Sequence, residues 1–259
     1  MNLYTLKKDN HKYKSKAQFN EDLYLLQIFK DKVDGVIVDV GANDGQYGSN
    51  SALLESLGWK SVLVEPNTSL CHQILAYRRP YKLFQFAASS KETEMVLYQV
   101  DGGALAHGLS TLELNTENKQ RIEENNFFYN PTSVRTRTLD SMLIEAGLSQ
   151  IDVISIDVEG HELEVLKGLS FEKWHPRILI IEDNSLFKSG DVSSFMKTKN
   201  YSRFFRTGVN DWYAADDDND LVNKTNSLFY MAGKYFSLAK FQLSKLYSVK
   251  RFIRKFLKK

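Results

Sequence analysis

The chain has 259 residues, 42% of them hydrophobic, which allows one α/β domain with a substantial core and argues against two large domains. Its single cysteine, Cys71, excludes an internal disulfide and a cysteine-built zinc cluster, and the lack of a signal peptide or an apolar stretch of roughly 20 residues predicts a cytoplasmic protein in a reducing compartment. Residues 234–259 carry nine bases and no acid, so the net charge of +2 leaves −7 on the first 233 residues. The acidic charge of these first 233 residues argues against a nucleic-acid partner.

The chain alternates apolar strand patterns with helical periodicity. Strands are predicted near residues 36–40, 61–65, 82–87, 94–100, 152–157, 177–182, 201–206 and 227–232. Helices are predicted near residues 20–30, 46–57, 67–77, 139–146, 161–168 and 191–199. This order predicts an α/β fold with a doubly wound, mostly parallel sheet. Because no helix separates the last two strands, we expect them to form an antiparallel final hairpin joined by the acidic residues 216–220.

The first predicted strand runs into a turn punctuated by glycines. Residues 36–40 are mostly β-branched, which suits a strand covered on both faces. Gly41 and Gly45 let the backbone turn sharply and approach a ligand, and the helix expected after them points its N–H groups at that ligand. Acids at Asp39 and Asp44 suit a cationic or hydroxyl-bearing ligand better than a pyrophosphate. The turn therefore indicates a nucleoside cofactor, with an ordinary strand-to-helix turn as the alternative.

The second predicted strand ends in an acid. Glu65 closes the run at 61–65, about twenty residues beyond the glycine turn, where a ribose lies in a doubly wound sheet. Its carboxylate can accept hydrogen bonds from both ribose hydroxyls. A helix-capping or solvated acid is the alternative, and the pairing with the glycine turn favours the ribose.

Residues 101–137 interrupt the alternation of strands and helices. The segment is rich in glycine, asparagine, threonine and aromatic residues, and it offers the polar-tipped side chains of His107 and Tyr129. A long segment of this kind is more often functional than idle. We expect a lid and an acceptor pocket here; an extra strand or helix without ligand contact is the alternative.

Two later strands deliver acids to the same edge of the predicted sheet. Asp157 ends the strand at 152–157, Glu159 follows it, and a helix is expected to start near His161. Glu182 and Asp183 end the next strand. Because the carboxyl ends of parallel strands meet at one edge, these side chains should converge beside the cofactor crevice.

Five motifs, in this order, resemble the FkbM-type S-adenosylmethionine-dependent methyltransferases. They are A-Q-F-N-E-D at 17–22, D-V-G-A-N-D-G at 39–45, V-E-P-N at 64–67, T-L-D-S-M-L at 138–143 and I-S-I-D-V-E-G-H-E-L-E-V-L-K-G at 154–168. The resemblance covers residues 17–232, and D-V-E-G-H-E is its most specific part. It implies a Rossmann-like class I methyltransferase fold with a seven-stranded sheet over residues 1–233. S-adenosylmethionine is the implied cofactor, and residues 101–137 are an insertion on the acceptor side.

The resemblance also implies a set of cofactor-binding residues. They are Gln18, Asp22, Asp39, Gly41, Asn43, Asp44, Gly45, Glu65, Pro66, Asn67, Gln85, Ala87 and Asp157. The chain departs from related enzymes at Gln85-Phe86-Ala87-Ala88, where those enzymes often carry an acid or an asparagine near the adenine. We therefore expect backbone groups and Gln85 to contact the adenine. The missing third glycine and the acidic turn disfavour an NAD-linked oxidoreductase.

Methyl transfer to a hydroxyl requires an aligned acceptor and removal of the hydroxyl proton as the bond forms. The candidate catalytic residues are Asp157, Glu159 and His161. Either Glu159 or His161 can be the base, because histidine has the better unperturbed pKa and a partly desolvated glutamate can be raised into range. For His161, a structural role at the start of its helix is the alternative.

The neighbouring acids also suggest a metal. Asp157, Glu182 and Asp183 offer oxygen ligands for a hard cation such as Mg²⁺, an arrangement similar to that of magnesium-dependent sugar O-methyltransferases. A plain hydrogen-bonding role for these acids is the alternative.

The basic tail, residues 234–259, is predicted to be an amphipathic C-terminal helix. Lysines and arginines lie on one face and phenylalanines and leucines on the other, so that residues 236–259 can lie in an anionic membrane surface. This places the protein in the cytoplasm, peripheral at the inner face of the membrane. Packing of the tail on the domain or in a homodimer is the alternative.

The leading functional hypothesis is a methyltransferase that acts on a hydroxyl of a sugar in the biosynthesis of a surface polysaccharide, such as capsule or lipopolysaccharide. The sugar acceptor rests on the family resemblance. A lipid, a small molecule or an amine as acceptor remains open, and so does a non-catalytic scaffold that only binds the cofactor.

Overall fold

The protein is described here by a computed structural model, in which residues 12–30, 32–103, 106–184 and 190–223 are placed. The predicted strand at 227–232 and the predicted C-terminal helix at 234–259 lie outside the described residues. Within the described residues, no helix is both long and apolar enough to cross a membrane.

A seven-stranded sheet forms the centre of the molecule, in the order β3-β2-β1-β7-β8-β10-β9. Its strands are β1 (Val36–Val40), β2 (Lys60–Val64), β3 (Lys82–Phe84), β7 (Val153–Ile156), β8 (Ile178–Glu182), β9 (Tyr201–Thr207) and β10 (Asn210–Ala215). The first five in this order pair in parallel, and β10 runs antiparallel to both β8 and β9. The predicted fold class, a mostly parallel doubly wound sheet with an antiparallel final hairpin, is confirmed.

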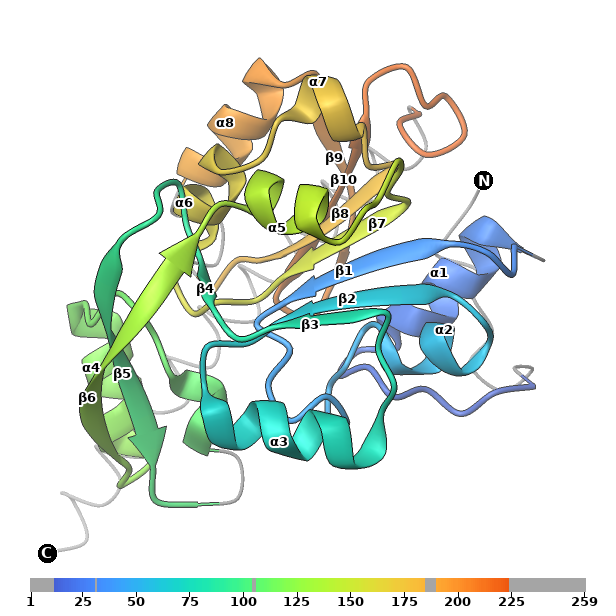
Figure 1. Cartoon of the computed structure of the whole chain (residues 1–259). Helices are drawn as coiled ribbons and strands as arrows, with labels where there is room; N and C mark the ends of the chain where they lie inside the picture. Colours follow the sequence, from blue (N-terminus) through green and yellow to red (C-terminus); the bar gives the residue numbers. More distant parts are fainter. Residues whose placement is uncertain (1–11, 31, 104–105, 185–189, 224–259) are drawn as a thin grey trace, which may run out of the picture.

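Helices cover both faces of this sheet (Figure 1). On one face α5, α6, α7 and α8 pack over the core residues of β1, β7 and β8, and on the other face α1 and α2 do so. The helices are α1 (Glu21–Phe29), α2 (Ala52–Ser56), α3 (Thr68–Tyr77), α5 (Leu139–Glu145), α6 (Glu162–Lys167), α7 (Phe171–Trp174) and α8 (Asp191–Thr198). Every residue of β1 and β8 is buried, as their apolar sequences predict, and each buried valine or isoleucine stabilises the fold by about 1.5–3 kcal/mol.

The register of the parallel strands brings their carboxyl ends level. Val40 pairs with both Val64 and Ile156, so that the next residues along each strand, Gly41, Glu65 and Asp157, lie side by side at one edge of the sheet. This edge is where an open α/β sheet binds its ligands.

The insertion and the strands just before it form a second layer at this same edge. A smaller sheet has the order β4-β6-β5, built from β4 (Ala87–Ala88), β6 (Phe128–Arg137) and β5 (Glu94–Asp101). Between β5 and β6 lie a 3₁₀-helix, η3 (Ala106–Leu109), and helix α4 (Thr116–Glu124). Figure 1 shows this sheet and α4 beside the main sheet. The predicted strand at 82–87 is thus divided between the two sheets.

Two predicted elements differ from the structure. In the final hairpin β9 pairs with β10, a strand that was not predicted, whereas the strand predicted to form this hairpin was at 227–232. Gly208 and Val209 join β9 to β10, so the acidic residues 216–220 follow the hairpin and do not connect its strands. Gly208 has φ +53, which fits a two-residue hairpin turn. The predicted helix at 46–57 is shorter, because Gly48 has φ +71 and the helix begins only at Ala52.

Candidate active site

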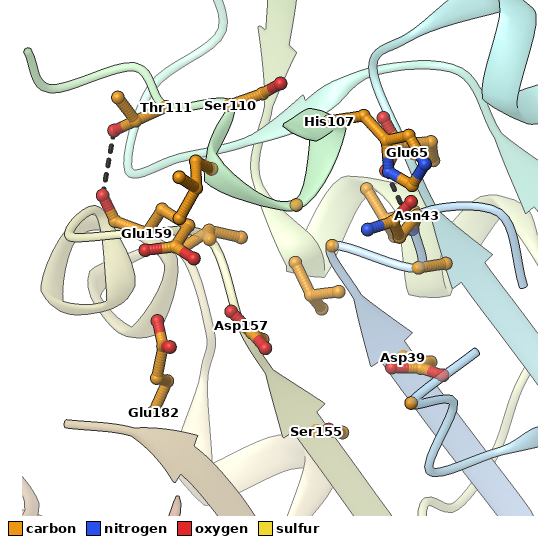
Figure 2. A pocket seen from close by; sticks show the side chains of 18 of the residues that line it. Asp39, Asn43, Glu65, His107, Ser110, Thr111, Ser155, Asp157, Glu159 and Glu182 are labelled. Atoms are coloured by element: carbon orange, nitrogen blue, oxygen red, sulfur yellow. Dashed lines mark hydrogen bonds between the residues drawn. The ribbon is translucent and has the colours of Figure 1, made fainter. Parts of the chain in front are cut away.

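A cavity of about 510 Å³ opens at the carboxyl edge of the main sheet. It is lined by the ends of β1, β2 and β7 and, on the opposite side, by residues 107–112 of the insertion. Figure 2 shows side chains around this space that come from the strand ends on one side and from the insertion on the other. The volume falls in the range of about 300–1,000 Å³ that small-molecule and cofactor sites occupy.

The glycine turn forms one wall of the cavity. Gly41 has φ +81, and a Cβ atom on it would lie 1.8 Å from the carbonyl oxygen of Asp157. The residue is therefore glycine both for its backbone conformation and for the close approach of β1 to the end of β7. Beyond it, an Asp44 oxygen accepts hydrogen bonds from the N–H groups of Gln46 (2.8 Å) and Tyr47 (3.0 Å), which fixes the turn.

Two buried charged residues, Asp39 and Arg78, hold this turn through hydrogen bonds. An Asp39 oxygen accepts a hydrogen bond from Ser51 Oγ at 2.6 Å, and burial raises the pKa of Asp39 against this stabilising contact. Arg78 is also buried and donates to the carbonyl oxygen of Gly45 at 3.0 Å and to Ser51 Oγ at 3.0 Å. Asp39 lines the cavity, whereas Arg78 supports the turn from behind.

Glu65 is held in place at the end of β2. Its two carboxylate oxygens accept the N–H groups of Asn43 (2.9 Å) and Asn67 (2.8 Å). Burial raises the pKa of Glu65 to about 7, and the two N–H bonds oppose this rise. His107 of η3 and Glu65 line the same cavity. The carboxylate thus retains lone pairs for a ligand in a pocket that the insertion helps to close.

Asn50 supplies a polar atom that awaits a partner. The residue lines the cavity and is 8% exposed; its Nδ2 donates to Ser155 Oγ at 2.9 Å. Its Oδ1 is buried and has no hydrogen-bond partner among the described residues. Buried polar atoms are nearly always satisfied, so this oxygen is a candidate acceptor for a donor group on a bound ligand.

Three carboxylates meet at the end of β7 and β8. Oxygen atoms of Asp157, Glu159 and Glu182 lie within 4.8 Å of one another. Burial raises the pKa of Asp157 to about 7, and the neighbouring charge of Glu159 adds to this rise; the exposed surface of Asp157 faces the cavity. Burial and the charge of Asp157 hold the pKa of Glu182 well above its usual range.

The insertion brings a positive charge to this cluster. Arg121 of α4 forms an ion pair with Glu159, with Nη1 2.5 Å from Oε2. Burial raises the pKa of Glu159, and Arg121 opposes that rise. Such crowded carboxylates need a cation nearby, and Arg121 provides one.

His161 lies next to the cluster but does not line the cavity. The ring is 4% exposed and both nitrogens are engaged: Nε2 is 3.0 Å from Ser89 Oγ, and Nδ1 is 2.8 Å from a carboxylate oxygen of Glu113. The side chain therefore connects the insertion to the domain. Of the two predicted bases, Glu159 is the one that faces the cavity.

Comparison with known proteins identifies the family. The family model described as Methyltransferase FkbM domain matches residues 39–203, more than half of the chain. The chain belongs to the FkbM methyltransferase family. The resemblance that the sequence motifs indicated is thereby confirmed.

A curated relative is the 2-O-methyltransferase NoeI of Sinorhizobium fredii (strain NBRC 101917 / NGR234). The two proteins are 31% identical over 145 residues, which is 53% of this chain and 58% of the relative. The alignment therefore spans a little more than half of the relative's length.

Solved structures give looser matches. The chain aligns with the precorrin-6y C5,15-methyltransferase of Geobacter metallireducens at a TM-score of 0.38 and 11% identity, over 79% of this chain and 92% of that chain. It aligns with a putative RNA methyltransferase of Pyrococcus horikoshii at a TM-score of 0.37 and 12% identity, over 82% of this chain and 95% of that chain.

Most of the predicted site residues of this FkbM-family protein surround one cavity. Those that line it are Gln18, Asp39, Gly41, Asn43, Asp44, Glu65, Pro66, Ala87, Asp157, Glu159 and Glu182. Asp183 is outside the carboxylate cluster, because Arg206 Nη1 lies 3.4 Å from its carboxylate. The three-acid group therefore contains Glu159 in the place predicted for Asp183.

Four predicted cofactor residues lie outside the cavity lining. Asp22 accepts hydrogen bonds from Ser15 Oγ and the Lys16 N–H, both at 2.6 Å, and so fixes the segment before α1. Asn67 caps α3, and the exposed Gln85 donates to a threonine on that helix. Gly45 shapes the turn from behind.

The sequence reasoning missed the polar residues that come from α4 and the loop before it. Thr111, Asn118 and Arg121 all contact Glu159. Asn115 accepts the Asn118 N–H at 2.8 Å as an N-cap, and this capping signal is present in the sequence. The contacts to Glu159 span 38 to 48 residues and leave no local pattern.

Proposed function

We propose that the chain is an S-adenosylmethionine-dependent O-methyltransferase that acts on a hydroxyl of a sugar. The observation that carries the proposal is a single cavity with a nucleoside-type wall on one side, made by the glycine turn and Glu65, and a carboxylate cluster on the other. Family membership supports methyl transfer, and the name of the relative NoeI supports a hydroxyl acceptor.

The residues present fit the cofactor. Glu65 would accept hydrogen bonds from the ribose diol, and the lining residues Pro66 and Ala87 suit an adenine nearby. Asp39 and the unpartnered Asn50 Oδ1 suit the ammonium of the methionine end, because both offer oxygen acceptors in a buried site. Gln18 lines the same cavity and can contact the carboxylate of that end.

When bound, the cofactor supplies an electrophilic methyl group. Glu159 accepts the proton of the acceptor hydroxyl as the oxygen–carbon bond forms and the carbon–sulfur bond breaks. Burial raises the pKa of Glu159 and so makes its carboxylate a stronger base, while the ion pair with Arg121 opposes that rise. Asp157 orients the acceptor from the end of β7.

The proposal also includes a divalent cation bound by the carboxylate cluster. Asp157, Glu159 and Glu182 offer oxygen ligands of the kind that Mg²⁺ prefers, and their atoms are close enough to share one ion. The ion would neutralise the cluster and lower the pKa of an acceptor hydroxyl. Full activity after exhaustive chelation would exclude it.

The proposal also names the class of molecule that accepts the methyl group. We place it in a surface polysaccharide or in its precursor, assembled in the cytoplasm, on the strength of the family resemblance and the 2-O-methyltransferase relative. The test is a screen with radiolabelled S-adenosylmethionine against nucleotide sugars, monosaccharide glycosides and polysaccharide fractions. Label in a lipid or an amine, with none in any sugar, would contradict the sugar acceptor.

Calorimetry tests the cofactor separately. S-adenosylmethionine and its demethylated product should bind, and NAD should not. Binding of NAD in place of the methyl donor would overturn the proposal, whatever the acceptor screen returns.

A further inference from the structure

Glu159 has an unusual backbone conformation. Its φ is +54, in the left-handed region that favours glycine and disfavours other residues, and Gly160 follows with φ +109. Non-glycine residues keep such a conformation where their surroundings enforce it, and they gather at active sites. The surroundings of Glu159 therefore bear directly on how its carboxylate is presented.

The insertion holds the main chain of Glu159 at one atom. Thr111 Oγ1 donates to the Glu159 carbonyl oxygen at 2.8 Å, and Asn118 Nδ2 donates to the same oxygen at 2.9 Å. Figure 2 shows the Thr111 bond. Both donors are buried, so water does not compete for the carbonyl. Two donors on one carbonyl fix both the position and the direction of that peptide group.

The far side of the turn is held by the domain itself. A Glu162 carboxylate oxygen accepts the Gly160 N–H at 2.9 Å. The turn is thus hydrogen-bonded on two sides. Glu162 of α6 bonds to it on one side, and Thr111 and Asn118 bond to it on the other. Of these three residues, Thr111 is the one that also lines the cavity.

The two donors are themselves anchored. Thr111 and Tyr98 exchange backbone hydrogen bonds of 2.9 and 3.3 Å, which ties the loop to β5. Helix α4 packs through Ile122 against Val100 of β5 and Ala106 of η3, so that Asn118 is fixed by a small apolar cluster. A rigid support of this kind can transmit its position to the residue that it contacts.

We propose that Thr111 and Asn118 are positioning residues, which set the left-handed conformation of Glu159 and thereby aim its carboxylate at the acceptor hydroxyl. The inference rests on the proposed function, because it takes Glu159 as the base. It gives the insertion a second task besides closing the cavity: the base is on the domain, but its orientation comes from the insertion.

Two nearly isosteric substitutions test this directly. Thr111→Val removes the hydroxyl donor, and Asn118→Asp replaces the amide donor with an acceptor of the same size. Turnover is measured with radiolabelled S-adenosylmethionine and the monosaccharide glycoside that the native protein methylates fastest. Each variant should lower kcat about fivefold to tenfold, the loss expected for one hydrogen bond, with little change in the dissociation constant of the cofactor.

Two further variants serve as controls. Thr111→Ser keeps the hydroxyl and should recover most of the lost kcat. Thr132→Val makes the same change as Thr111→Val at an exposed threonine of β6, whose hydroxyl bonds to Gln99, and should leave kcat unchanged. Amide hydrogen exchange of residues 158–161 provides a readout that needs no acceptor, and it should accelerate in Thr111→Val and Asn118→Asp alone.

Three results would overturn the inference. One is native kcat in both donor variants, and another is unchanged amide exchange at the turn. The third is a loss confined to cofactor affinity, which would make Thr111 a cofactor contact. Glu159→Gln distinguishes failure of this inference from failure of the proposed function. If Glu159→Gln retains native turnover, Glu159 is not the base. If Glu159→Gln is inactive while Thr111→Val and Asn118→Asp keep native turnover, only the positioning role is refuted.

Discussion

Arg121 Nη1 lies 2.5 Å from Glu159 Oε2, so a residue of the insertion neutralises a carboxylate of the domain. Burial alone would lower the pKa of Arg121, but the nearby charges of Glu159, Glu182 and Asp157 outweigh burial and raise it. The Arg121 guanidinium is therefore part of the carboxylate cluster. Its positive charge offsets negative charge that a bound metal ion would otherwise neutralise.

The first prediction concerns competition between Arg121 and a divalent cation. Arg121→Ala frees Glu159 and leaves the three acids without their cation, so we expect Mg²⁺ to bind about tenfold more tightly, the equivalent of about 1.4 kcal/mol. Isothermal titration of the native protein and the variant with MgCl₂ measures this. Arg121→Lys, which keeps the charge, should resemble the native protein; equal Mg²⁺ affinity in all three proteins would show that Arg121 and the ion do not compete.

The second prediction separates the two predicted bases. Glu159→Gln should lower kcat by about 10²–10⁴, the usual contribution of a general base, and leave the melting temperature close to native. His161→Ala should instead lower the melting temperature, because it breaks the contacts with Ser89 and Glu113. Turnover and thermal unfolding of both variants decide the matter, and a larger kcat loss in His161→Ala at native stability would assign the base to His161.

The main sheet could be predicted from the sequence because its strands carry local signals. The apolar runs at β1 and β8 leave few other interpretations, and the acids directly after β2 and β7 reach the site because parallel strands end level. Strand β10 was not predicted, because it begins with the polar residues Asn210 and Asp211. The Asp211 carboxylate is neutralised by Arg203 and Arg206, each at 2.7 Å, a contact that no alternation of polar and apolar residues reveals.

The site was predictable only where one element supplies a whole motif. The turn at Gly41 and the acids Asp157 and Glu159 belong to continuous segments. The engagement of His161 by Ser89 and Glu113, by contrast, depends on residues 72 and 48 positions away. Contacts at such separations follow from the packing of the insertion on the domain, and a single sequence does not encode them in a readable pattern.

The third prediction is a pH dependence of cofactor binding. The pKa of Glu65 is raised to about 7, chiefly by burial, and the ionised carboxylate is the form that accepts ribose hydroxyls. Protonation therefore competes with binding below pH 7, where the dissociation constant of S-adenosylhomocysteine should rise about tenfold per pH unit. Calorimetry between pH 6 and pH 8 measures it. Glu65→Gln should bind weakly at every pH, and a flat profile in the native protein would contradict the assignment.

The last prediction concerns the contact between β1 and the end of β7. Gly41→Ala forces a Cβ atom to within 1.8 Å of the Asp157 carbonyl oxygen and adds the strain of φ +81. Both backbones belong to the central sheet and have no room to move apart, so the free energy of unfolding should fall by more than about 3 kcal/mol. Denaturant unfolding measures the loss.

Gly147→Ala is the matched control for this change. Gly147 has a similar φ of +67, but no atom lies within 4 Å of its ideal Cβ position. Only backbone strain applies there, at about 1–2 kcal/mol. If the two substitutions lower the free energy of unfolding equally, the close approach of Gly41 to Asp157 contributes nothing to stability. A clearly larger loss for Gly41→Ala means that the glycine turn after β1 and the end of β7 are packed as one rigid unit.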